Sequence, residues 1–405
     1  MAGPLRFLLL NLAHFLDHLF MLVFATVAAL ALISEWQMSY SQLIPYATPG
    51  FVAFGLFALP AGWLADRWDR HLMMVVFFTG IGLSAVATAL ATSPLQIGVG
   101  LFCIGVFAAI YHPVGIALVL EGQQRAGIRV AVNGVWGNMG VAVAALLTAY
   151  FIDTVGWRAA FVVPGVVSCL LGVLYWFTLR LTEASAITQS PGKKKPVMLL
   201  DKAILVRVLA VVFFTTALGG LVFQSTTFAL PRILAERVSS LEGAATLVGQ
   251  IAFMAFAAGS LGQLIVGYLL DRCSIAFVFM SVAALQVLFF SIAIFAEEKV
   301  AIVAAVGYML AAFGQIPIND ILIGRIAAPE LRSRILAMRY TITFIVMAST
   351  VPLIAWIHAS HGFGLLFKVL AMASALIFLA VCTLISTERQ LIGDTLTSSP
   401  EPVRE

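Results

Sequence analysis

The sequence predicts an all-α membrane protein of twelve spanning helices, which are arranged as two six-helix halves with pseudo-two-fold symmetry. Of its 405 residues, 62% are apolar and 10% are charged, whereas soluble proteins carry about a quarter charged residues. The apolar residues gather in blocks of about 20 or more, long enough to cross a bilayer as helices. The expected spans are residues 7–32, 42–64, 72–93, 96–121, 130–152, 158–180, 204–230, 243–269, 274–295, 300–325, 334–357 and 362–385.

The distribution of Lys and Arg predicts the orientation in the membrane. Seventeen of them lie at connections on the same side of the membrane as the N-terminus. Four lie at connections on the opposite side: Arg158, Arg232, Arg237 and Lys299. Because positive connections stay in the cytoplasm, both termini are expected there, in a multi-pass protein of a bacterial inner (plasma) membrane. The net charge of +4 reflects this topology and gives no indication of a nucleic-acid partner. A monomer in the lipid bilayer is expected.

The chain divides into two predicted halves, residues 1–180 and 204–386. Residues 181–203 are rich in Ser, Pro and Lys, which is typical of a flexible cytoplasmic linker, and residues 387–405 are expected to form a disordered cytoplasmic tail. The four cysteines have no paired spacing, so they indicate neither a disulfide nor a metal site. No cofactor is expected.

Two sequence landmarks recur at nearly one spacing. Residues 62–67 read Gly-Trp-Leu-Ala-Asp-Arg, and residues 267–272 read Gly-Tyr-Leu-Leu-Asp-Arg. Residues 156–161 read Gly-Trp-Arg-Ala-Ala-Phe, and residues 362–367 read Gly-Phe-Gly-Leu-Leu-Phe. Such self-similarity is common in transporter folds. The two landmarks therefore predict that the halves are internal repeats.

The first landmark also carries a family resemblance. Residues 62–70, with Gly62, Asp66, Arg67 and Arg70 in place, resemble the signature of the loop between helices 2 and 3 in the major facilitator superfamily. The resemblance covers the whole chain and implies a transporter that works by alternating access, with this loop as a conformational latch. Asp69 stands where the family usually has Gly. Gating is expected of Gly62, Asp66, Arg67 and Arg70, and of the degenerate second copy, Asp271 and Arg272.

Shorter stretches resemble one branch of that family. Residues 13–18, 111–113, 137–140 and 156–161 are similar to the fosmidomycin-resistance-like transporters, within the drug:proton antiporter branch. This resemblance implies efflux. However, the proline that drug antiporters carry in helix 5 is absent from residues 134–140.

The first span carries a stripe of polar residues at helical spacing: Asn11, His14, Asp17 and His18. Asp17 falls about 15 Å into this helix, near the bilayer midplane, where ionisable groups are costly and mark functional sites. Burial favours the neutral carboxyl, whereas a neighbouring imidazolium favours the carboxylate, so a change of access shifts its protonation. We predict that Asp17, His14 and His18 couple transport to protons. The alternative is that the stripe only hydrogen-bonds to other helices.

Other polar residues within spans are candidates for substrate contact. His112 is expected to face the histidines of the first span, and Pro113 frees a backbone carbonyl beside it. Most amides within spans only bind neighbouring helices, which is the alternative for each of them. The predicted substrate-binding residues are Tyr111, His112, Asn133, Trp136, Asn138, Gln224, Gln315 and Asn319.

Asp320 and Arg339 are the candidate gating residues of the second half. Asp320 lies about 8 Å from the expected cytoplasmic end of its span. Two roles of Asp320 are therefore weighed equally. One is gating or an ion pair with Arg325 or Arg339, and the other is substrate contact.

The main hypothesis is a secondary active transporter of a small organic solute, with proton-coupled efflux favoured over uptake of an organic acid. A phosphate-binding loop of an ATP-driven pump is absent from the sequence, and six histidines are few for a membrane di-metal oxygenase, so no enzyme is expected. A transporter of a transition metal or metal chelate, using the histidines and Asp17 as ligands, stays open. A non-transporting receptor or assembly factor also stays open and requires that replacing Asp17 leave function unchanged.

Overall fold

The computed structural model describes residues 2–121, 126–180, 202–326 and 329–397, which form only helices and turns. The first half comprises α1 (Ala2–Val27), η1 (Ala28–Leu32), α2 (Ile33–Glu35), α3 (Tyr40–Leu43), η2 (Ile44–Ala47), α4 (Thr48–Arg67), α5 (Arg70–Thr88), α6 (Pro94–Ala108), η3 (Tyr111–Gly115), α7 (Ile116–Leu120), α8 (Ala126–Thr154) and α9 (Ala159–Arg180). The second half comprises α10 (Lys202–Arg237), η4 (Ser239–Leu241), α11 (Ala245–Leu270), α12 (Ile275–Ala293), α13 (Glu298–Ile326) and α14 (Pro329–Thr397).

Eleven helical stretches of the described residues are long and apolar enough to cross a membrane. The last of them, Met338–Ile385, has 48 residues, about twice the length that one crossing needs. Gly362 interrupts it with a non-helical backbone (φ 65°, ψ −170°), so this stretch supplies two crossings. With that division, the predicted all-α fold of twelve spanning helices is confirmed.

The first sequence repeat is also a repeat of structure. The Arg67 guanidinium lies 4.2 Å from the ring centroid of Trp63, and the Arg272 guanidinium lies 4.2 Å from that of Tyr268. The two pairs occupy matching positions of the repeat, at the ends of α4 and α11. Each arginine thus extends along the aromatic ring four residues earlier in the chain.

The second repeat places matching glycines before two helices. Gly156 precedes α9 with φ of 98°, and Gly362 precedes the last crossing with φ of 65°. Side chains rarely adopt such a backbone. The glycines at the start of this landmark are therefore required by the same sharp turn in both halves.

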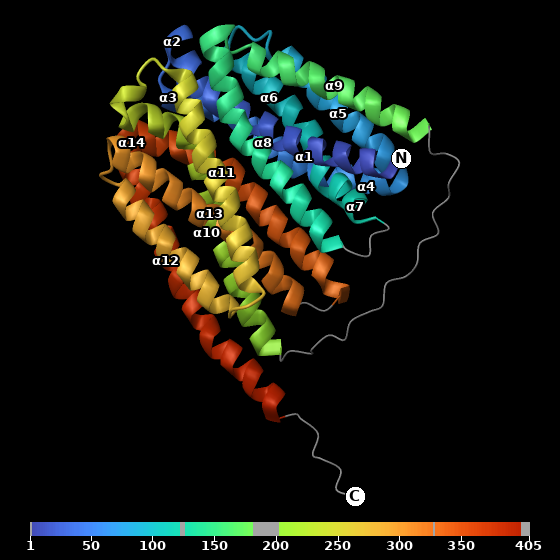
Figure 1. The fold of residues 1–405 in the computed structure, drawn as a ribbon, viewed down its shortest axis with the longest axis vertical. Helices are drawn as coiled ribbons and strands as arrows, with labels where there is room; N and C mark the ends of the chain where they lie inside the picture. Colours follow the sequence, from blue (N-terminus) through green and yellow to red (C-terminus); the bar gives the residue numbers. More distant parts are fainter. Residues whose placement is uncertain (1, 122–125, 181–201, 327–328, 398–405) are drawn as a thin grey trace, which may run out of the picture.

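The two halves meet at one end of the molecule and diverge at the other. Figure 1 shows α3 of the first half beside α14 of the second, while the far ends of α9 and α10 point apart. We call the end with α3, η1 and the Gly362 break the joined end, and the end with the chain termini the spread end.

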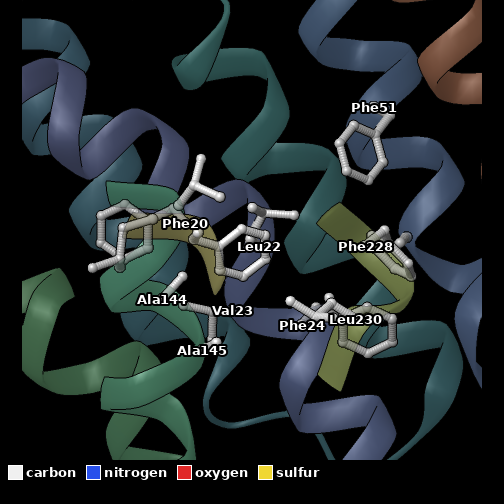
Figure 2. Packing of buried hydrophobic residues seen from close by; sticks show 14 of the residues in the cluster. Phe20, Leu22, Val23, Phe24, Phe51, Ala144, Ala145, Phe228 and Leu230 are labelled. Atoms are coloured by element: carbon white, nitrogen blue, oxygen red, sulfur yellow. The ribbon is translucent and has the colours of Figure 1, made fainter. Parts of the chain in front are cut away.

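Aromatic side chains fill the space between the halves near the joined end. Figure 2 shows Phe20 and Phe24 of α1 with Phe51 of α4 and Phe228 of α10, and each is at most 3% exposed. The ring centroids of Phe51 and Phe228 lie 5.9 Å apart, which is contact across the two halves. We call these four buried residues the apolar plug, in which Phe51 and Phe228 make the contact between the halves.

Several helices continue past the expected span ends. Helix α10 runs to Arg237 rather than residue 230, and α14 runs to Thr397, past residue 386 where the second half was expected to end. Hydropathy marks where lipid contact stops, whereas backbone hydrogen bonding carries a helix on into water. Most of the predicted linker (181–201) and the end of the predicted tail (398–405) lie outside the described residues.

We predict that Gly362→Ala destabilises the protein by about 1–3 kcal/mol, because its backbone lies in a region that is almost exclusive to glycine. Thermal unfolding of the purified protein in detergent measures the change. The matched control is Gly267→Ala, in helix α11, where an added methyl group meets nothing within 4 Å. Equal transition temperatures for Gly362→Ala and the wild type would contradict the assignment.

Candidate functional site

The polar stripe of α1 meets η3 and α8 in the first half, and it forms a cluster of three histidines and one carboxylate. The Nε2 atoms of His14 and His18 lie 3.1 Å apart. His112 approaches both rings edge-on, with centroid distances of 5.5 and 5.7 Å. Its Nε2 lies 3.4 Å from Oδ2 of Asp17. The expectation that His112 faces His14 and His18 is therefore met, and we call these four residues the histidine cluster.

A distorted turn places His112 in this cluster. Pro113 has no N–H and its ring crowds the preceding turn of helix, and residues Tyr111–Gly115 form a π-helical turn. Such turns are frequent at functional sites because they re-aim side chains. The helix break expected at Pro113 thus takes the form of one wide turn.

Buried hydrogen bonds hold the cluster from behind. Nδ1 of His14 lies 2.8 Å from the Asn133 carbonyl oxygen, and the Asn133 amide donates to Asn11 (3.0 Å) and to the Tyr111 hydroxyl (2.8 Å). The Tyr111 ring also stacks on His14 at 4.7 Å. Of the predicted substrate residues, Tyr111 and Asn133 therefore support the histidines rather than line open space.

Asp17 is the most isolated polar group of the cluster. Its side chain is fully buried, and apart from the His112 ring, 3.4 Å from Oδ2, neither carboxylate oxygen has a polar partner among the described residues. A buried charge without donors is costly, so a proton or a cationic partner must neutralise this carboxylate. His112 contacts this carboxylate and is itself partly exposed, with 23% of its side chain accessible.

His112 also touches an aromatic contact between the halves. Its ring centroid lies 5.7 Å from that of Phe54 in α4 and 6.5 Å from that of Phe344 in α14. Phe54 and Phe344 contact each other at 5.0 Å, and Tyr340 stacks on Phe344 at 6.3 Å. We call Phe54, Phe344 and Tyr340 the aromatic seam. It joins the histidine cluster of one half to the second half.

A cation adjoins the far side of this seam. Arg339 precedes Tyr340, its guanidinium lies 5.3 Å from that ring centroid, and it pairs with Asp320 of α13. Arg339 is 9% exposed, and its Nε has no hydrogen-bond partner. The expected ion pair of Asp320 therefore forms with Arg339, whereas the Arg325 side chain lies outside the described residues.

The remaining predicted amides are distributed over other environments. Gln315 accepts from Gln286 at 2.8 Å and Asn319 donates to Thr216 at 3.2 Å, so both bind neighbouring helices inside the second half. Gln224 is 1% exposed, with an unpartnered Nε2. Asn138 donates to Gln263 across the halves at 2.6 Å, and Trp136 is half-buried on α8. Gln315 and Asn319 thus lie in helix packing and away from the seam.

The predicted latch residues lie at the spread end. Arg70 donates to Asp66 at 2.6 Å, with 46% and 64% of the side chains exposed, and a pair this exposed contributes about 0–1 kcal/mol. A methyl group on Gly62 would lie 3.3 Å from Pro113, so α4 approaches the π-helical turn closely here. Asp271 is exposed at the matching end of α11.

The polar contacts at the joined end were not predicted from the sequence. The Ser41 hydroxyl and Nδ1 of His358 are 2.9 Å apart, and Nε2 of the same ring lies 2.9 Å from Glu236. The Thr246 backbone N–H and hydroxyl both donate to Asp153, at 2.6 and 2.5 Å. The Ser41–His358 and Thr246–Asp153 contacts join one half to the other, whereas the His358–Glu236 contact lies within the second half. The sequence offered no signal for the pairing of His358 with Ser41, which is 317 residues away.

Residues 10–319 match the model of the Major Facilitator Superfamily. The chain belongs to the major facilitator superfamily. This membership confirms the prediction of a transporter rather than an enzyme.

Similar proteins include two transporters of aromatic acids. The gallate transporter of Pseudomonas putida is 25% identical over 60% of this chain and 60% of its own length. The 4-hydroxybenzoate transporter PcaK of Pseudomonas putida is 26% identical over 65% of each chain. The matched region thus spans under two thirds of these relatives.

The fold extends further than the sequence similarity. A bacterial homologue of the human lysosomal transporter Spinster, solved in an inward-facing and occupied conformation, superposes with a TM-score of 0.73 at 14% identity. The match covers 96% of this chain and 97% of that one. At this identity the likeness shows the fold alone.

We predict that Gly137→Ala displaces His14, because an added methyl group would lie 2.6 Å from Nε2 of that ring. Overpacking of this kind costs about 1–3 kcal/mol. Nitrogen-15 spectra of labelled histidine rings report the displacement, and thermal unfolding reports the cost. The control is Gly134→Ala, one turn earlier on α8, where a methyl group meets nothing within 4 Å. Unchanged His14 signals in Gly137→Ala would refute the close contact.

Proposed function

We propose that this chain imports a small aromatic carboxylic acid together with a proton. The observation that carries the proposal is the position of His112, which contacts Asp17 on one side and the aromatic seam on the other. A proton site and a contact between the two halves thus share one side chain. Coupling requires such sharing, because protonation must bias the relative position of the halves.

The proposed proton acceptor is Asp17. Its buried carboxylate has no hydrogen-bond donor, so protonation removes the cost of an isolated charge. His112 reaches that carboxylate from the partly exposed side, and it can transfer a proton as a neutral or charged imidazole. His14 and His18 complete the path, since their Nε2 atoms are 3.1 Å apart.

The proposed solute site is the aromatic seam with Arg339. Aromatic rings bind a flat organic solute by stacking and edge contacts, and a guanidinium with an unpartnered Nε offers a donor to a carboxylate. A carboxylate solute can therefore compete with Asp320 for Arg339. The similarity to transporters named for gallate and 4-hydroxybenzoate supports this class of solute.

Import is the direction that we propose, in place of the efflux favoured by the sequence. The resemblance to drug:proton antiporters rested on short stretches, whereas the relatives reported above are named for small carboxylates. A monoanion that moves with one proton carries no net charge, so an inward pH gradient drives its entry regardless of the membrane potential. The same residues could serve efflux if solute and proton moved in opposite directions, and the transport assay below separates the two.

We further propose that the joined end faces outward and acts as the outer gate. The distribution of Lys and Arg supports this orientation. In this proposal, the apolar plug and the contacts of His358 and Asp153 close the outer side in the conformation described. The proposed inner latches, at Asp66 and Asp271, then act when the spread end closes.

We predict that Asp17→Asn abolishes proton-driven accumulation. With one proton per solute, a pH gradient of one unit supports about tenfold accumulation of radiolabelled 4-hydroxybenzoate or gallate in vesicles, since one unit is worth about 1.4 kcal/mol. Asn cannot take up the proton, so the variant accumulates no more solute than protein-free vesicles do. These vesicles control for diffusion of the neutral acid across the lipid. Glu297→Gln, at an exposed position, is the matched charge control. Wild-type accumulation by Asp17→Asn would overturn the coupling, and proton-driven expulsion would establish efflux.

We predict that Asp153→Ala with His358→Ala opens the joined end. Each variant removes a polar contact between the halves worth about 1 kcal/mol, so the outward-open population rises roughly 30-fold. Electron-spin distances between labels at exposed Val155 and Phe295 measure it, with the four native cysteines replaced by Ser.

The control for this measurement is Glu298→Ala. Glu298 binds Ser239 at the same end of the molecule but within one half. Its removal should leave the distance distribution unchanged. A distribution that is the same in the double variant and the wild type would exclude these contacts as the gate.

A further inference from the structure

The histidine cluster also has the geometry of a metal site. One ring nitrogen from each of His14, His18 and His112 lies within 4.8 Å of the other two, and Oδ2 of Asp17 lies 3.4 Å from Nε2 of His112. Zinc binds imidazole nitrogen at about 2.0–2.1 Å in a tetrahedron, which sets its ligand atoms about 3.4 Å apart. The observed separations of 3.1 Å, between His14 and His18, and 3.4 Å match this spacing.

The surroundings of His14 are those of a metal ligand. Histidines that bind metals usually donate the other ring N–H to a carbonyl or carboxylate, which fixes the tautomer and the ring orientation. Nδ1 of His14 lies 2.8 Å from the Asn133 carbonyl oxygen, so that nitrogen carries the hydrogen. Nε2 of His14 therefore presents a lone pair toward His18.

The unpartnered carboxylate supplies the fourth donor and the charge. Asp17 has no hydrogen-bond donor for either oxygen, and a divalent cation satisfies it as a proton does. Imidazole nitrogens with one carboxylate favour Zn²⁺ and its neighbours over Mg²⁺ or Ca²⁺, which take mostly oxygen ligands. The partly exposed edges of His18 and His112 give an ion access.

We propose that His14, His18, His112 and Asp17 bind one Zn²⁺ or similar divalent transition-metal ion, and that the bound ion blocks transport. The blocking part rests on the proposed function, because the ion occupies the groups that exchange the proton. All four ligands belong to the first half, so the ion does not link the two halves. It competes instead with protons for the same side chains. Metal binding requires deprotonated ligands, so acidification weakens it.

The test of binding uses purified protein without a polyhistidine tag, titrated with Zn²⁺ by calorimetry and with Co²⁺ by visible absorption. We expect one ion per chain, a tetrahedral Co²⁺ spectrum, and affinity that falls as pH is lowered. His18→Gln and His112→Gln each weaken binding about 10-fold or more, as loss of a ligand or its support does. His361→Ala, at an exposed position outside the cluster, leaves it unchanged. Zn²⁺ affinity that is equal in the two cluster variants and the wild type overturns the site.

The test of blocking is transport in vesicles. We expect Zn²⁺ on the side of the spread end to inhibit proton-driven solute accumulation by the wild-type protein at the concentration that fills the site in the binding titrations. Zinc-65 that accumulates inside vesicles against its gradient would make the ion cargo and would overturn blocking. Failure of every tested solute to be transported would count against the proposed function, whereas the binding titrations decide the metal site independently.

Discussion

A carboxyl group with no hydrogen-bond donor, fully buried between helices, is the constraint on which the rest of the structure depends. An ionised Asp17 in that position costs several kcal/mol unless a proton or a cation compensates it. The nearby features all act on this group. The π-helical turn brings His112 to the carboxylate, Gly137 leaves room for His14, and the Asn133 carbonyl fixes the His14 ring. A site built to neutralise one charge reversibly is the physical basis for both the proton coupling and the metal binding that we propose.

The contacts between the halves differ along the molecule, and the difference explains how the bundle can move. Near the middle the halves touch through aromatic rings, Phe54 against Phe344 and Phe51 against Phe228. Ring contacts have no charge to leave unpaired when they separate. At the joined end the halves touch through hydrogen bonds to partly or fully exposed groups such as Ser41 and Asp153. Those groups can exchange a protein partner for water at small cost, so closure there is reversible.

Much of this architecture follows from sequence because it depends on local spacing. Spans follow from apolar length, the two-fold repeat follows from Asp66 and Asp271, and the polar face of α1 follows from the spacing of His14 to Asp17 and His18. Contacts between distant segments do not follow. The partners Ser41 and His358 are separated by 317 residues, and no periodicity predicts their pairing. Gln315 resembles a substrate ligand in sequence, yet its amide is used in packing against Gln286, because only the packed structure shows which amides already have partners.

The central claim is that solute binding and protonation of Asp17 are one linked event. The most direct measurement is the number of protons taken up when solute binds, obtained by calorimetry in buffers of different ionisation enthalpy over a range of pH. The account predicts a pH range in which the wild-type protein takes up about one proton per solute, and no such range in Asp17→Asn. Equal proton uptake by both proteins would contradict it.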